Sequence, residues 1–392
     1  MPIKHNKKTL NINIINASPS NVNPNTQNYF SNGYHGDHVD LQSLNSIINT
    51  KISPKYKILR YLGQGIQGSL YLATDVDNKR YICKKIILDN TQNQPQNNSI
   101  EKQNQLQFEL KVLQYLSNNE TTREYVNPCL EHKILDNNIY TIFPVFDGYS
   151  LSHYNKYLSR LQHSDYYKLV FHLIKSILHG MAKIHKTHIA HQNINENSIL
   201  VSSNTNPREL FVKFTDFGLG CGYINSGIGT GNILDVNDYK NDAFFKLTTC
   251  KENSNIPIEI SDSIKDKLSE SSYLQLSQKY DLLCLGMIFI KLLLFFDNLD
   301  IDLSNGYNKE FIEKIKRRLI EKYLSKHNDS SIGTRYKNRF PLLNVSDDIK
   351  RDLLEYIRMF VNYIFCKTNN RKNCQYVLDK LVIYEKYKND IF

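Results

Sequence analysis

Residues 191–201 read His-Gln-Asn-Ile-Asn-Glu-Asn-Ser-Ile-Leu-Val, a polar stretch that ends in three apolar side chains. In front of it, residues 169–185 carry apolar side chains at the spacing of an amphipathic helix. Its last part, residues 199–201, is apolar and partly β-branched, which favours a short strand. We therefore expect residues 191–198 to form a polar loop between a helix and a strand.

A glycine-rich pattern lies upstream, where residues 63–68 match Gly-x-Gly-x-x-Gly. The pattern alone also occurs in dinucleotide-binding folds, in which a helix opens at the third glycine. Here residues 56–62 read as a strand before it, and residues 69–74 and 80–87 read as two strands after it. The last of these strands carries Lys84. Glycines let backbone N–H groups approach phosphates closely, so the pattern favours a phosphate-binding turn within a small sheet.

This order of patterns resembles the eukaryotic protein kinases, whose catalytic loop reads His-Arg-Asp, four variable residues and Asn before a short strand. His191 stands at the His position of that loop. Residues 216–218 read Asp-Phe-Gly, which matches a second kinase motif at a suitable distance from the first. By motif order, the resemblance extends from about residue 56 to residue 387.

The resemblance implies an α+β, two-lobed protein-kinase-like domain over residues 53–392. We expect a small β-rich N-lobe over about residues 53–145 and a mainly helical C-lobe over about residues 146–392. Residues 1–52 are polar and lack sustained periodicity, which predicts a disordered N-terminal arm. A short helix over residues 39–48 is the alternative for the end of that arm.

The loop departs from the family pattern at the positions that carry the chemistry. Asn193 stands at the position of the catalytic Asp, and an amide cannot act as a general base near neutral pH. Loss of acid–base catalysis alone costs a factor on the order of 10²–10⁴. Asn195 replaces a Lys that neutralises the transferring phosphoryl group, and Ser198 replaces the metal-binding Asn. Gln192 replaces the Arg that reads an activation-loop phosphate, so that switch is expected to be absent.

The nucleotide-binding side of the pattern is better preserved. By the resemblance, Lys84 pairs with Glu109 of a following helix, and Asp216 is a metal ligand toward the phosphates. ATP with Mg²⁺ is the implied cofactor, weakly bound or absent, because Ile82 stands where a small residue usually packs over adenine. The residues implied to contact the cofactor are Gly63, Gly65, Gly68, Leu70, Ile82, Lys84, Glu109, Phe143, Pro144, Phe146, Leu200 and Asp216.

Other motif residues are expected to have structural roles. Asp281 lies in an apolar helical run, and by the resemblance its carboxylate bonds the backbone of the catalytic loop. Residues 256–260 resemble the Ala-Pro-Glu motif, whose acid would pair with Arg371. The remaining structural residues implied by the resemblance are His191, Phe217 and Gly218.

Composition narrows the class of protein. Seven cysteines without a Cys-x-x-Cys pair indicate reduced thiols and an intracellular, cytoplasmic or nuclear protein. The sequence shows no apolar leader and no stretch as long as a membrane span. The net charge of +10 is moderate for 392 residues, and no feature indicates a specific nucleic acid partner. Residues 311–327 form a basic amphipathic pattern, either a solvated face or a docking site for an acidic partner.

Two functions from different classes fit these observations. The first is a regulatory or scaffold protein with a kinase-like fold, a pseudokinase that transfers no phosphoryl group and binds an active kinase or another signalling protein. The second is a divergent, weakly active, ATP-dependent Ser/Thr kinase that recruits another base. Glu196 is the carboxylate nearest to Asn193 in the sequence, so its position discriminates between the two.

Overall fold

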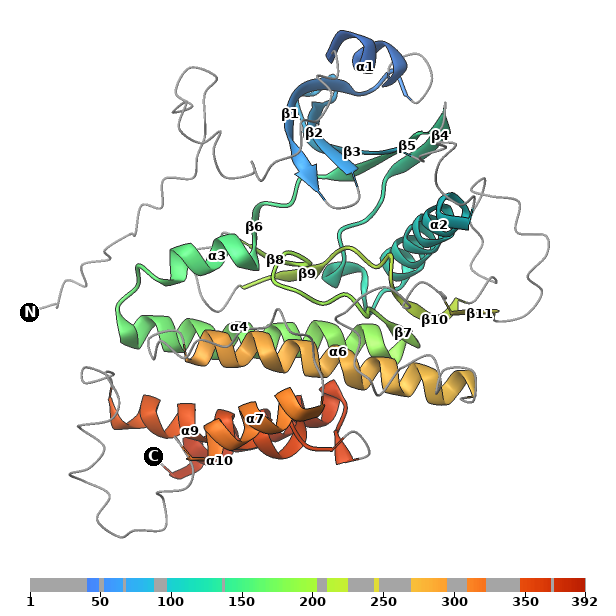
Figure 1. Ribbon diagram of the computed structural model, residues 1–392. Helices are drawn as coiled ribbons and strands as arrows, with labels where there is room; N and C mark the ends of the chain where they lie inside the picture. The colour runs from blue at the N-terminus through green and yellow to red at the C-terminus, as the bar shows by residue number, and fades with distance from the viewer. Residues whose placement is uncertain are drawn as a thin grey trace, which may run out of the picture. The chain divides into compact units, whose positions relative to one another are not determined.

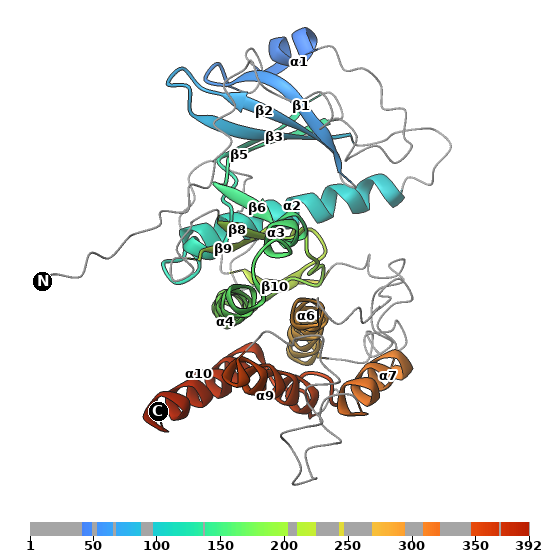
Figure 2. The same cartoon turned by 90° about the vertical axis from the view of Figure 1, so that its left-hand side faces the viewer.

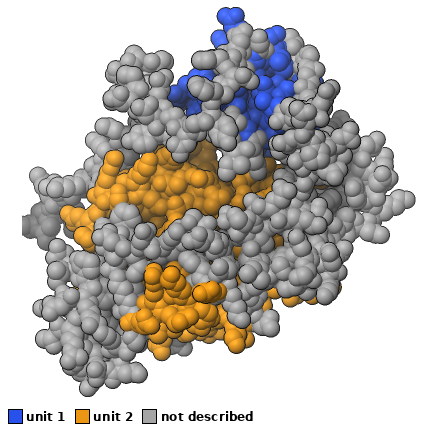
Figure 3. Space-filling view, viewed as in Figure 1, with its two compact units in different colours: residues 1–91, 129–145, 203–209 blue, residues 92–128, 146–202, 210–392 orange. Residues whose placement is uncertain are grey.

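The computed structural model describes residues 41–48, 53–65, 68–87, 97–135, 138–202, 210–224, 243–246, 269–294, 309–321, 346–367 and 370–391 (Figure 1). The chain divides into two compact units (Figure 3). Unit 1 comprises residues 1–91, 129–145 and 203–209, and unit 2 comprises residues 92–128, 146–202 and 210–392. Unit 1 is built on a β-sheet and unit 2 is mainly helical, which confirms the expected α+β, two-lobed fold class.

Unit 1 is a five-stranded antiparallel sheet with the strand order β1-β2-β3-β5-β4. Its strands are β1 (Lys57–Gly65), β2 (Gly68–Thr74), β3 (Arg80–Ile87), β4 (Glu131–Leu135) and β5 (Asn138–Pro144). The glycine-rich pattern forms the hairpin between β1 and β2, with Gly65 paired to Gly68. The third glycine therefore begins a strand, as the sequence predicts for a kinase-like sheet.

The two faces of this sheet differ, because successive side chains of a strand point to opposite sides. Tyr71 and Ala73 of β2 and Tyr81 and Cys83 of β3 are buried in one apolar cluster. The alternate positions of the same strands, among them Ile82, are only half-buried. One face of the sheet is therefore covered by apolar side chains of unit 1 itself.

A short helix, α1 (Leu41–Ile47), covers that apolar face. Leu44 and Ile48 are one helical turn apart and are buried in the same cluster. The Asn45 side chain donates to Ile58 O at 3.0 Å and accepts from Ile58 N at 2.6 Å. The end of the expected N-terminal arm is thus folded onto the sheet, because its apolar stripe and Asn45 find partners there. Residues 1–40 and 49–52 lie outside the described part of the chain.

Unit 2 is organised around α4 (His163–Lys186) and α6 (Glu270–Leu293), which lie side by side in Figures 1 and 2. Residues 281–290 of α6 are all buried, which is typical of a helix surrounded by other elements of the core. The Tyr166 hydroxyl of α4 donates to Leu292 O of α6 at 2.6 Å. Helix α10 (Cys374–Ile391) packs on α4, where Lys175 and Glu385 form an ion pair at 2.7 Å.

Shorter elements complete unit 2. They are α2 (Asn97–Asn118), η3 (Arg123–Tyr125), α3 (Leu151–Leu158), α7 (Lys309–Leu319) and α9 (Asp347–Tyr363). Two three-stranded antiparallel sheets, β6-β8-β9 and β11-β10-β7, lie among them. Their strands are β6 (Gly148–Ser150), β7 (Ile189–Ala190), β8 (Ile199–Ser202), β9 (Val212–Phe214), β10 (Cys221–Ile224) and β11 (Ala243–Lys246). None of the described helices is long and apolar enough to cross a membrane.

Helix α2 differs from the expectation in its grouping. It lies within the range expected for the N-lobe, about residues 53–145, but it groups with unit 2 rather than with the sheet of unit 1. The reason is that α2 contacts η3 and β10, and that Val126, just after η3, forms a parallel bridge with Phe214 of β9.

Several expected features lie outside the described residues. After the Asp-Phe-Gly motif, residues 225–242 and 247–268 are not described. The Ala-Pro-Glu match at residues 256–260 and the end of the basic pattern beyond residue 321 are therefore not among the described residues.

Candidate active site

The predicted polar loop connects two small sheets of unit 2. Helix α4 ends at Lys186 and is followed by β7, the loop over residues 191–198, and β8. Strand β7 pairs with β10, and β8 pairs with both β6 and β9. Strand pairing at both ends therefore holds the loop in place.

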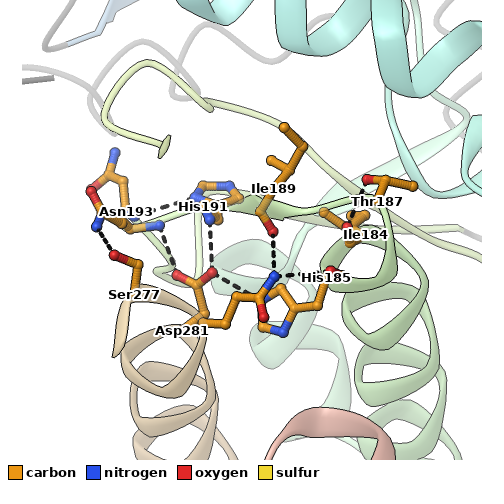
Figure 4. A network of polar contacts seen from close by, with 10 residues as sticks. Ile184, His185, Thr187, Ile189, His191, Asn193, Ser277 and Asp281 are labelled. Atoms are coloured by element: carbon orange, nitrogen blue, oxygen red, sulfur yellow. Dashed lines mark hydrogen bonds and ion pairs between the residues drawn. The ribbon is translucent and has the colours of Figure 1, made fainter. Parts of the chain in front are cut away.

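Asp281 of α6 anchors the start of the loop from below (Figure 4). Its fully buried carboxylate accepts hydrogen bonds from His191 N and Gln192 N, both at 2.7 Å. The His185 ring donates a third one from Nε2 at 3.0 Å. A buried carboxylate is stable only when such donors replace its hydration. Asp281 thus holds two consecutive backbone N–H groups at the start of the loop.

His191 connects the loop to the Asp-Phe-Gly segment. Its Nδ1 accepts from Asn193 N at 3.2 Å, so the ring proton is on Nε2, which donates to Thr215 O at 2.9 Å. The ring lies against Phe217, with 4.4 Å between the ring centroids. Burial lowers the pKa of the His191 imidazole, which favours the neutral ring that this pattern requires.

Gln192 points into unit 2. It is buried, and its backbone has a φ of 60°. Its side-chain amide donates to the Ser277 hydroxyl and, at 3.3 Å, to the Tyr273 hydroxyl, both on α6. Gln192 stands where the kinase pattern has the Arg that binds an activation-loop phosphate. Here its side chain instead joins the loop to α6.

Asn193 and Asp216 are in direct contact. The Asn193 amide donates from Nδ2 to Asp216 Oδ2 at 2.7 Å. Hydrogen bonds to a charged group typically contribute about 1.5–3 kcal/mol. The other carboxylate oxygen, Oδ1, is buried without a hydrogen-bond partner among the described residues. The structure therefore brings together the residue at the catalytic position and the predicted metal ligand, with an amide hydrogen between them.

Asn195 and Ser198 use their polar groups within the loop. The Ser198 hydroxyl donates to Asn195 O at 2.9 Å and accepts from Asn195 N at 3.0 Å. The Asn195 amide donates to Asn193 O at 3.0 Å, and its oxygen accepts from Asn197 N at 2.9 Å. Ser198 is almost fully buried. These contacts stabilise a tight turn and direct the Ser198 hydroxyl toward backbone.

Glu196 is held by α6. Its Oε1 lies 3.6 Å from Nζ of Lys291, and its backbone oxygen accepts from Ser152 N of α3 at 3.1 Å. The carboxylate is thus paired with a cation near the end of α6. This arrangement gives Glu196 a structural explanation that does not involve Asn193.

The donors around Asp216 do not fit the pair of divalent cations that the kinase fold implies. Mg²⁺ requires oxygen ligands in a near-octahedral arrangement. Asp216 Oδ2 accepts from the Asn193 amide, and the Ser198 hydroxyl is committed to the Asn195 backbone. Asp216 Oδ1 has no hydrogen-bond partner among the residues that the structure describes, which leaves one carboxylate oxygen for a cation.

The expected nucleotide contacts of unit 1 share one face of its sheet. Ile82 is paired with Leu72 and with Phe143, and Lys84 is paired with Leu70. Side chains of directly paired residues lie on the same side of a sheet. The strand register therefore places four of the expected contacts on the face of the sheet opposite α1: Leu70, Ile82, Lys84 and Phe143.

Gly68 has a packing reason to be a glycine. A Cβ atom at this position would lie 2.3 Å from Lys85 O and 2.9 Å from Ile86 Cγ1 of β3. Any side chain would therefore collide with the neighbouring strand. The glycine is required by the hairpin itself, whether or not a phosphate binds there.

The other expected contacts divide between the two units. Gly63, Gly65 and Pro144 belong to unit 1, whereas Glu109, Phe146, Leu200 and Asp216 belong to unit 2. The pairing of Lys84 with Glu109, which is buried on α2, stays a prediction.

Two of the expected structural residues are buried in unit 2. Gly218 is buried beside Phe217. Arg371 is buried and donates from Nε to Ile364 O at 2.8 Å.

Sequence reasoning missed the residues that support the loop. His185 binds Asp281, and Tyr273 and Ser277 bind Gln192. A signal for two of them was present, because Tyr273, Ser277 and Asp281 are spaced four residues apart on one side of a helix. Polar groups repeated at that spacing in an apolar helix indicate a line of hydrogen bonds.

Comparison with known proteins agrees with the fold. Residues 56–239 match the family model described as protein kinase domain. The chain is therefore similar to protein kinases over residues 56–239. It is 27% identical over 168 residues to the SNF1-related protein kinase catalytic subunit alpha KIN12 of Arabidopsis thaliana. The matched part is 43% of this chain and 30% of that protein, so the chain spans under a third of the length of this relative.

Proposed function

We propose that this protein is a kinase-like regulatory or scaffold protein that does not transfer phosphoryl groups. The observation that carries the proposal is the hydrogen bond from the Asn193 amide to Asp216. In the kinase reaction the protein contributes positioning and charge stabilisation, and the catalytic-loop Asp accepts the proton of the substrate hydroxyl. The Asn193 amide is neutral and faces Asp216 with its N–H group, so it offers no base to a substrate.

The alternative, a divergent and weakly active Ser/Thr kinase, needs another carboxylate near Asn193. Glu196 was the candidate, and its pairing with Lys291 disfavours that role. The Ser198 hydroxyl, bonded to Asn195, also supplies no cation ligand. Both observations support the regulatory function over the enzymatic one.

Binding of ATP is proposed to be weak or absent. Ile82 lies between Leu72 and Phe143 on its face of the sheet, and its branched side chain would crowd an adenine ring there. Lys84 is the cation of the same face. Any affinity for ATP should therefore depend on Lys84.

The test measures phosphoryl transfer and ATP binding in parallel. With Mg²⁺ or Mn²⁺ and a generic protein substrate, we expect transfer by the purified chain to equal that of the Lys84→Ala variant. In a thermal-shift titration, any stabilisation by ATP should disappear in Lys84→Ala. Lys133→Ala, a change at an exposed lysine of β4, is the matched control and should behave like the unmodified chain. Transfer above the Lys84→Ala background would favour the enzyme.

A protein partner is the second part of the proposal, and α7 offers a surface for it. Ile315 and Leu319 are buried where α7 packs against α9, and Lys314, Arg317 and Arg318 are exposed. The structural explanation is that basic side chains near the C-terminus of a helix interact favourably with the helix dipole. The functional explanation is that the stripe Lys314, Arg317 and Arg318 docks an acidic partner.

Salt dependence discriminates between these explanations. If the α7 stripe docks an acidic partner, binding of a Glu-rich peptide should weaken steeply with salt, because exposed charges are screened over about 8 Å at physiological ionic strength. The variant K314Q/R317Q/R318Q should lose this binding. The control R351Q/R358Q should keep it, since both arginines lie on α9 next to carboxylates at i−3. Equal binding by both variants would show that the stripe is only a solvated face of the helix.

A further inference from the structure

The contact between Asn193 and Asp216 has only one chemically sensible orientation. A carboxylate only accepts hydrogen bonds, so the amide nitrogen of Asn193, and not its oxygen, must face Asp216 Oδ2. The amide nitrogen has no lone pair to offer a metal ion. The group nearest to Asp216 therefore presents a positive hydrogen where a cation would need an oxygen ligand.

The neighbouring loop favours this orientation. The backbone oxygen of Asn193 accepts from the Asn195 amide, and its backbone N–H is bound to the His191 ring. The Asn195 backbone is in turn closed by Ser198. Asn193 is thus held at three points, two through its backbone and one through its side chain. The side-chain amide is presented to Asp216 by a turn that Asn195 and Ser198 close with hydrogen bonds inside the loop.

We propose that the Asn193 amide takes the place of a divalent cation beside Asp216, so that the loop and the Asp-Phe-Gly segment are joined without metal. The inference rests on the proposed function, because a phosphoryl-transferring site would need the cation. It assigns Asn193 a positioning role in addition to the loss of a base. Asp216 then serves as an acceptor that fixes the loop, and its affinity for cations is low.

Cation binding to the full chain, without nucleotide, tests the proposal directly. Mn²⁺ alone is the probe, followed through the relaxation of water protons. We expect no saturable, Asp216-dependent binding to the unmodified chain. Asn193→Asp should bind Mn²⁺ at least about tenfold more tightly than the unmodified chain, equivalent to about 1.4 kcal/mol, because two carboxylates then face each other. Asn193→Ala should bind no more weakly than the unmodified chain.

The opposite order of Mn²⁺ affinities would overturn the proposal. If the unmodified chain binds Mn²⁺ and both Asn193→Ala and Asp216→Asn weaken that binding, the amide oxygen is a cation ligand. Failure of Asn193→Asp to fold does not remove the test. A double-mutant cycle of Asn193→Ala and Asp216→Ala, measured by denaturant unfolding in EDTA, should show a coupling that added Mn²⁺ leaves unchanged. No coupling, or coupling that Mn²⁺ abolishes, contradicts the proposal.

The outcome separates this inference from the proposed function. A chain that binds Mn²⁺ through Asn193 and Asp216 but transfers no phosphate would overturn the inference alone. A chain that transfers phosphate in a Lys84-dependent manner would overturn the proposed function, whatever the Mn²⁺ titration shows.

Discussion

Asp281→Ala is expected to lower the free energy of unfolding by about 3–5 kcal/mol, because each buried donor that loses its acceptor costs about 1–3 kcal/mol. The carboxylate accepts from His191 N, Gln192 N and the His185 ring inside unit 2. No water replaces the lost acceptor where these groups are buried. Denaturant unfolding followed by circular dichroism measures the change.

Asp352→Ala is the matched control for this prediction. Asp352 of α9 is also buried, and its carboxylate accepts a hydrogen bond from the Tyr384 hydroxyl at 2.8 Å. We expect this variant to be destabilised less than Asp281→Ala, because Asp281 binds two backbone N–H groups of the loop and the His185 ring. Equal losses for the two variants would mean that the loop is not anchored through Asp281.

Asn193→Asp, Asn195→Lys and Ser198→Asn together are expected to raise phosphoryl transfer over the unmodified chain by a factor on the order of 10²–10⁴, the range of general acid–base catalysis. The triple change removes the amide from Asp216, releases the turn closed by Ser198, and restores a base, a cation and a metal ligand. Asn193→Asp alone should stay at background, because catalytic groups that act as a unit are strongly non-additive. A radiolabelled phosphate-transfer assay with Mg²⁺ measures both.

Three results would contradict this prediction. Transfer by the triple variant that persists after an added Lys84→Ala change would show a contaminating kinase. Full transfer by Asn193→Asp alone would show that Asn195 and Ser198 do not limit the reaction. If the triple variant stays at background although it binds ATP, further groups of the site are missing.

Much of the fold was predictable from order and spacing. The glycine pattern followed by a strand, and the His191 stretch between a helix and a strand, resemble protein kinases. Local patterns of this kind are visible in a sequence because they depend on neighbouring residues only. It was harder to predict which helix packs with which sheet. Helix α2 belongs with unit 2, where it contacts η3, which follows it closely, and β10, which is remote in the sequence.

The sequence by itself determined which residue types stand in the loop, and therefore that Asn193 cannot act as a base. Only the tertiary structure decided where the polar side chains point: Asn193 to Asp216, Gln192 to Ser277 and Glu196 to Lys291. The physical reason is that each of these side chains had several possible partners. Two of the three partners lie on α6, about 90 residues away in the chain, and only the packing of α6 beneath the loop brings them within hydrogen-bond or ion-pair distance.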